Sequence, residues 1–347
     1  MLIHGGDTAG FFAEFGHQPI DFSANVSPLG LPPKVRKAAI DALDKADQYP
    51  DPLCRDLRTA IATHECCYAN QIFCGNGAAD VIYRLVQARK PRKALLPAPT
   101  FAEYGLALEQ VGCEIERFSL KAEQNFQITA EILAKIDYSV DILFICQPNN
   151  PTGALCDMPL LEQILERCEA CGTLLVIDGC FAEFLDDYKE FSLEKHINSP
   201  NLVILKAFTK LYAMAGLRLG YCISADEKLL ENMALAGQPW GVSCVAQQAG
   251  IAALLEQDYV NQLKDFLRQE KVFLVTNLAK MGCRVYPPSV NYIFFQSVID
   301  LDSRLRKKGI LIRSCVNYEG LEPGYFRVAV RTHEENLQLI KALQEVL

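Results

Sequence analysis

Several features that would assign the protein to particular classes are missing from its 347 residues. No run of about 18 uncharged apolar residues occurs, which is the length that a membrane-spanning helix needs. The amino-terminal segment MLIHGGDTAGFF has no basic region followed by an apolar run, as a secretion signal would have. We therefore expect a cytoplasmic protein without a membrane partner.

An excess of positive charge is also missing. The 34 lysine and arginine residues are outnumbered by 42 aspartate and glutamate residues, which gives a formal net charge of −8. This balance argues against a surface that binds polyanions, so we expect no nucleic-acid partner. Any phosphate must then be bound by a few local cations.

Patterns typical of metal sites and disulfides are absent, although cysteine itself is not. The 14 cysteines are scattered singly through apolar segments, which is typical of a reduced intracellular core. The nearest approaches to metal-ligand spacing are Cys66-Cys67 and Cys168-x-x-Cys171, and no further His or Cys pair at ligand spacing accompanies them. We therefore expect no bound metal.

From about residue 70 the chain alternates between two kinds of segment. Short β-rich runs such as DILFICQP, TLLVIDG and NLVILKAF are separated by amphipathic helical segments such as MPLLEQILERCEAC. This alternation predicts an α/β fold with a mostly parallel central sheet covered by helices. In such sheets ligands bind at the carboxyl ends of the strands.

The pattern changes near residue 256. A long helical pattern over roughly 258–281 precedes two or three strand-like runs and a final helix, which predicts a smaller α+β unit. The prolines and glycines of VSPLGLPP predict an extended amino-terminal arm. We therefore expect an arm over residues 1–40 that joins the small domain, a large domain over 41–256 and a small domain over 257–347.

Two buried strands end on opposite charges, Asp178 in LVIDGCF and Lys210 in ILKAFTK. Without further residues around them, an aspartate and a lysine placed in this way are most simply a structural ion pair. However, the glycine-rich turn CGNGAADVI opens a helix that could present N–H groups to an anion, and Arg218 carries a fork suited to phosphate. Phe101 is either core or a platform for a ring. Together these residues suit a flat, phosphorylated cofactor with an aldehyde, which a desolvated lysine can bind as a Schiff base.

Three motifs carry a family resemblance. PNNPTG, the strand-end Asp178 and TKLYAMAGLRLG resemble the signatures of fold-type I pyridoxal-phosphate enzymes, in the branch of histidinol-phosphate aminotransferase. HGG at 4–6, DFSANVSPLGLPP at 21–33, YPDP at 49–52, QPWGVSCVAQQA, LIRSCVNYEGL and YFRVAVRT further resemble the cobalamin-pathway threonine-phosphate decarboxylases. The resemblance covers nearly the whole chain. It implies pyridoxal 5'-phosphate as cofactor, the fold-type I transferase fold and a homodimer with a shared active site.

The resemblance also implies roles for individual residues. Lys210 would bond to the cofactor aldehyde and later move a proton, Asp178 would pair with the pyridinium nitrogen, and Asn150 would hydrogen-bond the ring hydroxyl. Phe101 would stack on the cofactor ring. The cofactor phosphate would be held by Arg218, Thr209 and the amides of Ala78 and Ala79. Tyr49 would reach the same phosphate from the neighbouring subunit.

A second set of residues is implied for a small phosphorylated amino-acid substrate. Arg327 in YFRVAVRT and Arg313 in LIRSC match anion-binding arginines of the family, although on the residues alone each is one of many surface arginines. His4 and Asn25 are either ordinary arm residues or substrate contacts, and the resemblance favours contact. Whether Arg327 holds the phosphate or the carboxylate stays open.

Several positions depart from the family pattern. Gly179 and Cys180 stand where Glu and Ala are usual, which predicts a less rigid strand end. Phe181 lacks the hydroxyl of the aminotransferase tyrosine, and this favours a decarboxylase. Ala207 stands where Ser or Thr often binds phosphate, and Ser314 replaces an Asp that is common beside the second arginine.

Three functions follow from these residues. The resemblance favours decarboxylation of L-threonine O-3-phosphate to aminopropanol phosphate. The alternative is histidinol-phosphate aminotransferase or a related aminotransferase, in which a Cα–H bond breaks and a 2-oxo acid accepts the amino group. A ligand-sensing module of a transcription regulator is a remote third hypothesis, since the chain is acidic and starts directly with the arm, without a DNA-binding segment.

Overall fold

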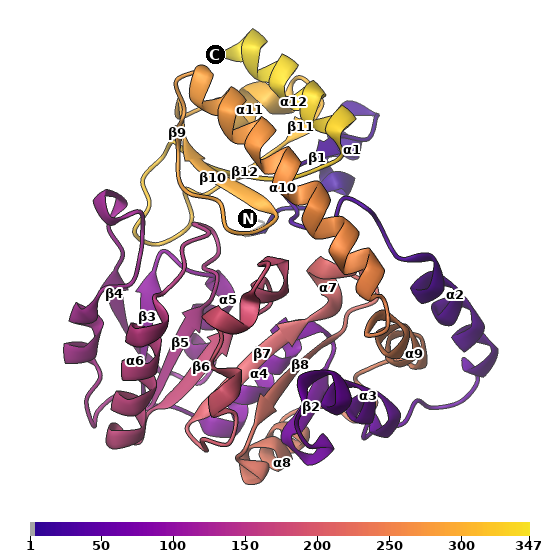
Figure 1. Ribbon diagram of the computed structural model, residues 1–347, viewed down its shortest axis with the longest axis vertical. Helices are drawn as coiled ribbons and strands as arrows, with labels where there is room; N and C mark the ends of the chain where they lie inside the picture. The colour runs from indigo at the N-terminus through magenta and orange to yellow at the C-terminus, as the bar shows by residue number, and fades with distance from the viewer. Residues whose placement is uncertain (1–3) are drawn as a thin grey trace.

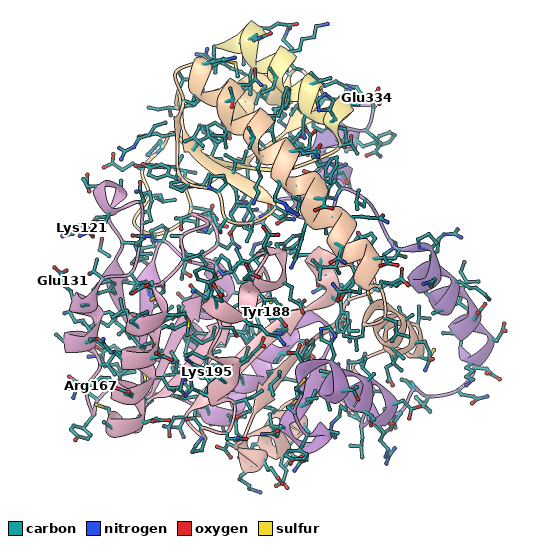
Figure 2. The ribbon with its side chains drawn as sticks, viewed as in Figure 1. Lys121, Glu131, Arg167, Tyr188, Lys195 and Glu334 are labelled. Carbon is teal, nitrogen blue, oxygen red and sulfur yellow. The ribbon has the colours of Figure 1, made fainter. Side chains whose placement is uncertain are left out.

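The computed structural model describes residues 4–347. A seven-stranded sheet surrounded by helices forms the larger part of the molecule. A smaller sheet with three helices lies above the strand ends of this large sheet (Figure 1). Side chains fill the space between these elements, while charged residues such as Lys121, Glu131 and Arg167 point outward from the periphery (Figure 2).

The large sheet has the strand order β2-β8-β7-β6-β5-β3-β4. Its strands are β2 (Ile72–Gly75), β3 (Lys93–Ala98), β4 (Glu114–Ser119), β5 (Ile142–Cys146), β6 (Leu174–Asp178), β7 (Leu202–Ala207) and β8 (Gly220–Ser224). β8 pairs antiparallel with both β2 and β7, and the remaining pairs in the sheet are parallel. The expectation of a mostly parallel sheet is therefore confirmed. Every residue of β5, β6 and β7 is buried, as their continuous apolar runs require.

Helices cover this sheet. They are α3 (Arg55–Glu65), α4 (Gly77–Arg89), α5 (Ala102–Glu109), α6 (Met158–Cys171), α7 (Phe208–Leu211), α8 (Glu227–Leu235) and α9 (Cys244–Ala253). In α6 the predicted apolar stripe is buried at Leu161, Ile164 and Leu165, and Gly172 ends the helix at a φ of 72°. Short 3-10 turns occupy Ala42–Lys45 (η1), Ala69–Gln71, Ala122–Gln124, Ala130–Lys135, Ala182–Phe184, Tyr188–Phe191 and Leu193–His196.

The small sheet is antiparallel in the order β12-β13-β10-β9. Its strands are β9 (Arg284–Val285), β10 (Tyr292–Gln296), β12 (Arg313–Ser314) and β13 (Tyr325–Ala329), and its helices are α10 (Gln257–Lys280), α11 (Leu301–Arg306) and α12 (His333–Val346). Four strands thus form where the sequence predicts two or three, because two of them are only two residues long. A two-residue strand is too short to show the alternation of apolar and polar residues by which strands are predicted.

The arm contacts both parts of the molecule. Its strand β1 (Ile20–Asp21) pairs in parallel with β11 (Ile310–Leu311), and its helix α2 (Pro33–Asp41) packs against α9. The prediction of an extended arm is wrong at α1 (Thr8–Phe15) and at α2. At α1 the Asp7 carboxylate accepts a hydrogen bond from the Gly10 amide, which caps the helix before the proline-rich stretch begins.

Within residues 4–347, no helix combines the length and the apolar character that crossing a membrane would require.

Candidate active site

A cavity of about 370 Å³ lies where the carboxyl ends of the central strands face the small sheet. Asp178 ends β6, Ala207 ends β7, and Arg313 and Arg327 approach from β12 and β13. Of the predicted site residues, those that line the cavity are His4, Asn25, Ala78, Ala79, Phe101, Asn150, Asp178, Thr209, Lys210, Arg218, Arg313 and Arg327. The fold therefore brings together residues that lie up to about 320 positions apart in the chain.

Lys210 lies in α7, directly after the carboxyl end of β7. Burial, and then the positive charge of Arg327, lower its pKa to about 8. A lysine with this pKa has an appreciable free-amine fraction at neutral pH, and the free amine is the nucleophilic form. Its backbone carbonyl accepts a hydrogen bond from the Ser27 amide at 2.9 Å, which ties the segment to the arm.

Asp178 is held through both of its carboxylate oxygens. Oδ1 accepts from the Cys180 amide at 3.0 Å, and Oδ2 accepts from the Tyr104 hydroxyl at 2.5 Å. Burial, together with the charge of Asp178, raises the pKa of Tyr104 well above its usual range, so the phenol stays a donor. The neighbouring Gly179 amide donates to Leu205 O at 2.8 Å. The backbone amides of Gly179 and Cys180 are therefore both hydrogen-bonded, at the strand end where the sequence predicts lower rigidity.

The two asparagines of PNNPTG have different surroundings. Asn149 is structural, because its side chain donates to Pro99 O and the Thr152 hydroxyl and accepts from the Thr100 hydroxyl, all at 2.9–3.0 Å. Asn150 lines the cavity, and its Oδ1 accepts from Arg327 and Tyr318.

The amino terminus of α4 forms one end of the cavity. Gly77 has a φ of 83°, and Ala78 and Ala79 follow it along the wall beside Thr209 and Arg218. A Cβ atom on Gly77 would lie 2.6 Å from Arg218 Nη2, so the missing side chain makes room for the guanidinium. Backbone N–H groups at the start of a helix together with an arginine form a site for an anion such as a phosphate.

Phe101 precedes α5 and exposes part of its ring to the cavity. The His4 ring lies 5.7 Å from it, centroid to centroid, and His4 Nε2 is 2.5 Å from Glu103 Oε1. The hydrogen bond with His4 is the largest of the causes that lower the pKa of Glu103, so this group remains a carboxylate. The arm thus reaches the cavity wall through His4.

The register of the small sheet brings two arginines side by side. Arg313 and Arg327 are directly paired residues on β12 and β13, and both line the cavity. Arg327 is buried, with Nη2 3.0 Å from Ser23 O. With the Asn25 amide oxygen facing the guanidinium, Arg327 also donates to it from Nε and Nη1 at 3.2 and 3.3 Å.

Arg313 has local support despite the replacement of the usual Asp by Ser314. Its Nη2 donates to Asn317 Oδ1 at 2.8 Å, and its guanidinium lies 5.3 Å from the centre of the Tyr318 ring. The two arginines form a second anion-binding region in addition to the one at Arg218.

Tyr49 is the predicted site residue that does not line the cavity. It is 80% exposed and stacks on Trp240 with ring centroids 4.6 Å apart. Its loop is anchored by a hydrogen bond from Gln247 Nε2 to Asp51 O at 3.0 Å.

Sequence reasoning missed Tyr104, Glu103 and Tyr318. Glu103 and Tyr104 come just after Phe101 in one turn of α5, and that proximity was the available signal. Tyr318 reaches the site from a loop that follows β12, and its available signal was its place in the segment LIRSCVNYEGL.

A second charged cluster lies on the other side of β7. The Lys206 ammonium contacts Glu65 at 2.7 and 2.9 Å and Glu194 at 2.7 Å, and it lies 5.0 Å from the centre of the Tyr188 ring. Although burial alone would lower it, the surrounding carboxylates hold the pKa of Lys206 well above its usual range.

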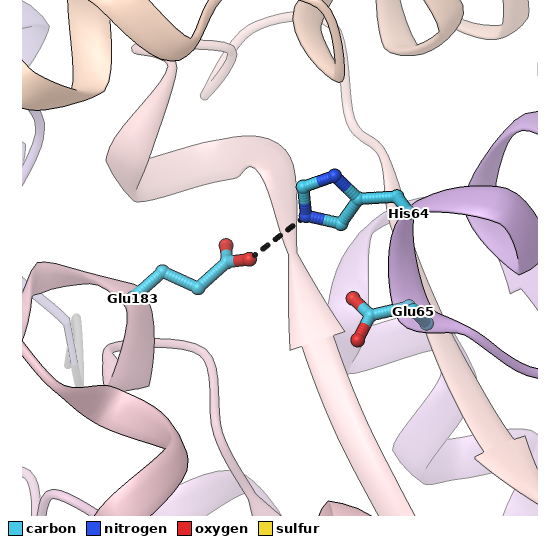
Figure 3. Close-up of side chains that lie close together, drawn as sticks. All are labelled: His64, Glu65 and Glu183. Atoms are coloured by element: carbon cyan, nitrogen blue, oxygen red, sulfur yellow. Dashed lines mark hydrogen bonds and ion pairs between the residues drawn. The ribbon is translucent and has the colours of Figure 1, made fainter.

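Next to it, His64, Glu65 and Glu183 point toward one another, with His64 Nε2 3.5 Å from Glu183 Oε1 (Figure 3). These three groups have the composition of a metal site. However, the Lys206 ammonium already supplies their counter-charge, 2.7 Å from Glu65 and 3.9 Å from Glu183. We therefore interpret the cluster as a structural ion network.

The cavity suits a flat phosphorylated molecule. It offers helix amides and Arg218 at one end, the buried carboxylate of Asp178, the ring of Phe101 and the amine of Lys210. Within residues 4–347, Asn150 Nδ2 donates to no acceptor and so remains available to a ligand. These groups match the phosphate, the ring nitrogen, the ring face, the aldehyde and the ring oxygen of pyridoxal phosphate.

Comparison with known proteins agrees with this geometry. The profile of the family described as aminotransferase class I and II matches residues 17–343. A threonine-phosphate decarboxylase of Salmonella typhimurium is 39% identical over 99% of this chain and 96% of its own length. A histidinol-phosphate aminotransferase of Symbiobacterium thermophilum is 31% identical over 95% of this chain and 91% of its own. In fold, the chain is similar to histidinol-phosphate aminotransferase from Sinorhizobium meliloti in complex with pyridoxal 5'-phosphate, with a TM-score of 0.88, 20% identity and coverage of 100% and 96%.

Proposed function

The chain belongs to the aminotransferase class I and II family, and on this premise we propose that it decarboxylates L-threonine O-3-phosphate to aminopropanol phosphate, a step of cobalamin biosynthesis. The observation that carries this proposal is the direct pairing of Arg313 with Arg327 at the cavity. Threonine phosphate carries two anionic groups, a phosphate and a carboxylate, so it can use both guanidinium groups. The 39% identical relative named as a threonine-phosphate decarboxylase supports the same substrate.

The cofactor is pyridoxal 5'-phosphate. Its phosphate would be held by Arg218, Thr209 and the amides of Ala78 and Ala79, and its ring would lie against Phe101. When bound, it supplies an electron sink for the pair left on the substrate when carbon dioxide leaves. Asp178 would keep the ring nitrogen protonated, and the Asn150 amide would donate to the ring oxygen.

Chain residues would perform the remaining steps. The amine of Lys210 would hold the cofactor aldehyde and, once released by the substrate, deliver a proton to the substrate carbon that lost carbon dioxide. Its pKa of about 8 suits both accepting and donating a proton near neutral pH. Arg327 and Arg313, together with Asn25 and His4, would bind the substrate anions and orient the carboxylate for cleavage.

Phe181 favours decarboxylation over amino transfer. It lines the cavity and is 5% exposed, with its ring edge-on to Tyr292 at 5.2 Å. A phenylalanine here cannot donate a hydrogen bond to the ring oxygen of the cofactor, whereas the tyrosine of an aminotransferase could. The alternative function, amino transfer from histidinol phosphate to a 2-oxo acid, is supported by the 31% identical relative of that name.

A homodimer with a shared active site completes the proposal. Tyr49 is exposed and does not line the cavity of its own chain, and we propose that it reaches the cofactor phosphate of the partner. Exposed apolar side chains close to Tyr49 in sequence, together with Trp240, which stacks on it, support a contact between copies. They are Ile40, Leu43, Leu53 and Trp240.

We further propose a division into an arm (1–40), a large domain (41–256) and a small domain (257–347), of which residues 1–3 lie outside the described part. A cytoplasmic location is supported by the cysteines, all 14 of which are free thiols.

The test is to incubate the cofactor-loaded enzyme with each substrate separately. With threonine phosphate alone we expect carbon dioxide and aminopropanol phosphate, with no need for a 2-oxo acid. Histidinol phosphate with 2-oxoglutarate should give little glutamate. Lys210→Ala controls for contaminating activity. Glutamate from histidinol phosphate, without carbon dioxide from threonine phosphate, would make the chain an aminotransferase.

A further inference from the structure

Tyr318 connects the two halves of the candidate site, although it was not among the predicted site residues. It lies in the loop between β12 and β13, is buried and lines the cavity. Its backbone is fixed on both sides, because its amide donates to Cys315 O at 3.0 Å and its carbonyl accepts from the Leu321 amide at 3.1 Å. The side chain is therefore presented from a well-tied loop.

The hydroxyl of Tyr318 acts on Asn150. It donates to Asn150 Oδ1 at 3.3 Å, and Arg327 Nη1 donates to the same oxygen. A carbonyl oxygen has two lone pairs, so these two donors fill its acceptor capacity. A rotated amide would turn its NH₂ group toward two donors, which is unfavourable. The amide is therefore held with Nδ2 as its free group.

The ring of Tyr318 acts on Arg313. The guanidinium lies 5.3 Å from the ring centre, within the range of a cation–π interaction. Burial raises the pKa of Tyr318, so the ring carries a neutral hydroxyl and not a phenolate. One side chain thus contacts both a proposed cofactor ligand and a proposed substrate ligand. Its hydroxyl hydrogen-bonds Asn150 and also the Arg313 side chain, and its ring face lies against the Arg313 guanidinium.

We propose that Tyr318 is a positioning residue: its hydroxyl keeps the N–H of Asn150 directed at the ring oxygen of the cofactor, and its ring keeps Arg313 in place for the substrate. This inference rests on the proposed function for the identity of both ligands. Because Tyr318 supplies the second donor to Asn150 Oδ1, the orientation of the amide does not depend on Arg327 alone. That matters when a substrate anion competes for the guanidinium of Arg327.

Two variants separate the two contacts. Tyr318→Phe removes the hydroxyl and keeps a ring beneath Arg313, whereas Tyr318→Leu removes both. Tyr286→Phe is the matched control, since Tyr286 is a buried tyrosine of the same hydrophobic cluster that does not line the cavity. The other charged and titratable groups at the cavity are the same in all three variants. They are Lys210, Asp178, Arg218, Arg313, Arg327, His4, Glu103, Cys146 and Cys180.

The first measurement is a pH titration of the visible absorption band of the cofactor-loaded protein, without substrate. A donor to the ring oxygen stabilises its anionic form, so a loosened Asn150 should raise the midpoint of the titration. We expect a rise of roughly half a pH unit or more in Tyr318→Phe and Tyr318→Leu, and none in Tyr286→Phe. Asn150→Ala should show the same direction. A wild-type midpoint in Tyr318→Phe would overturn the role of the hydroxyl.

The second measurement is steady-state kinetics with threonine phosphate. We expect the KM of Tyr318→Leu to exceed that of Tyr318→Phe by about fivefold or more, because only the leucine variant loses the cation–π contact. Equal KM values would overturn the role of the ring. The titration separates this inference from the proposed function: a shifted midpoint in a protein without decarboxylase activity would leave the Asn150 contact standing and remove the substrate assignment.

Discussion

The hydroxyl of Tyr104 donates a hydrogen bond to Asp178 Oδ2 at 2.5 Å, inside the buried end of the large sheet. The Tyr104 ring is held in turn by Phe144, which stacks on it at 4.9 Å. The carboxylate proposed to face the cofactor nitrogen therefore has a fixed direction before any ligand binds. Such preorganisation lowers the cost of stabilising charge during a reaction.

Tyr104→Phe should weaken catalysis without preventing folding. The phenylalanine retains the packing on Phe144 but removes the donor to Asp178 Oδ2, while the Cys180 amide still donates to Oδ1. Hydrogen bonds to charged groups contribute about 1.5–3 kcal/mol, so we expect kcat to fall about tenfold to a hundredfold. Steady-state kinetics at saturating cofactor would measure this, with Tyr286→Phe as control. An unchanged kcat would show that the bond does not support the reaction.

Lys210→Ala should abolish both the visible absorption band and turnover, since no other lysine lines the cavity formed by residues 4–347. In the wild-type protein, the rate at which the band appears after cofactor is added to cofactor-free enzyme should rise with pH. It should be half-maximal near pH 8, because only the free amine reacts.

Arg327→Gln tests the cause of this midpoint, because Arg327 is the charge that lowers the pKa of Lys210 most. The midpoint should move to higher pH in this variant. The same midpoint in both proteins would exclude an influence of Arg327 on the amine.

Gly77→Ala should weaken cofactor binding. The new Cβ would lie 2.6 Å from Arg218 Nη2, and the residue would keep a φ of 83°, which is strained for alanine. We expect a Kd for pyridoxal phosphate at least about tenfold higher, measured by fluorescence titration. Gly112→Ala is the control, since Gly112 has a φ of 70° but open space around it. Equal losses in both variants would indicate general strain instead of a displaced Arg218.

Lys206→Met should destabilise the fold. It would leave the buried carboxylate of Glu65 and its neighbours Glu183 and Glu194 without their cation, and breaking a buried ion pair from one side costs about 3–5 kcal/mol. Chemical denaturation at saturating cofactor measures this. Lys228→Met, which breaks an exposed pair with Glu231, should change the free energy of unfolding by less than about 0.5 kcal/mol. Similar values for the two variants would contradict a buried network.

His64 should make stability depend on pH. Its hydrogen bond with Glu183 raises its pKa in the folded protein above 6.5. The folded state therefore binds the proton more tightly than the unfolded state, so this stabilisation is complete below pH 6.5 and is lost as the pH rises through the folded pKa. His64→Gln should flatten the decline in the free energy of unfolding between about pH 6 and pH 8. An unchanged decline would assign it to other groups.

Local sequence was enough to predict the central strands and the placement of Asp178 and Lys210 at their ends. Continuous apolar runs identify β5, β6 and β7, and because parallel strands end at one edge, Asp178 and Lys210 could be assigned to the same site. The motif spacing also indicated Asn150, Arg218 and the α4 turn. These features are local, so they can be read along the chain.

The tertiary structure alone decided which distant residues meet. The pairing of Arg313 with Arg327 depends on the register of two short strands, and the contacts of Tyr104 and Tyr318 depend on how helices and loops pack. The different surroundings of Lys206 and Lys210 could not be predicted from the sequence either. The two lysines are four residues apart in one segment, yet neighbouring carboxylates raise the pKa of one while burial and Arg327 lower that of the other. Charge and burial depend on three-dimensional surroundings, and local sequence does not contain them.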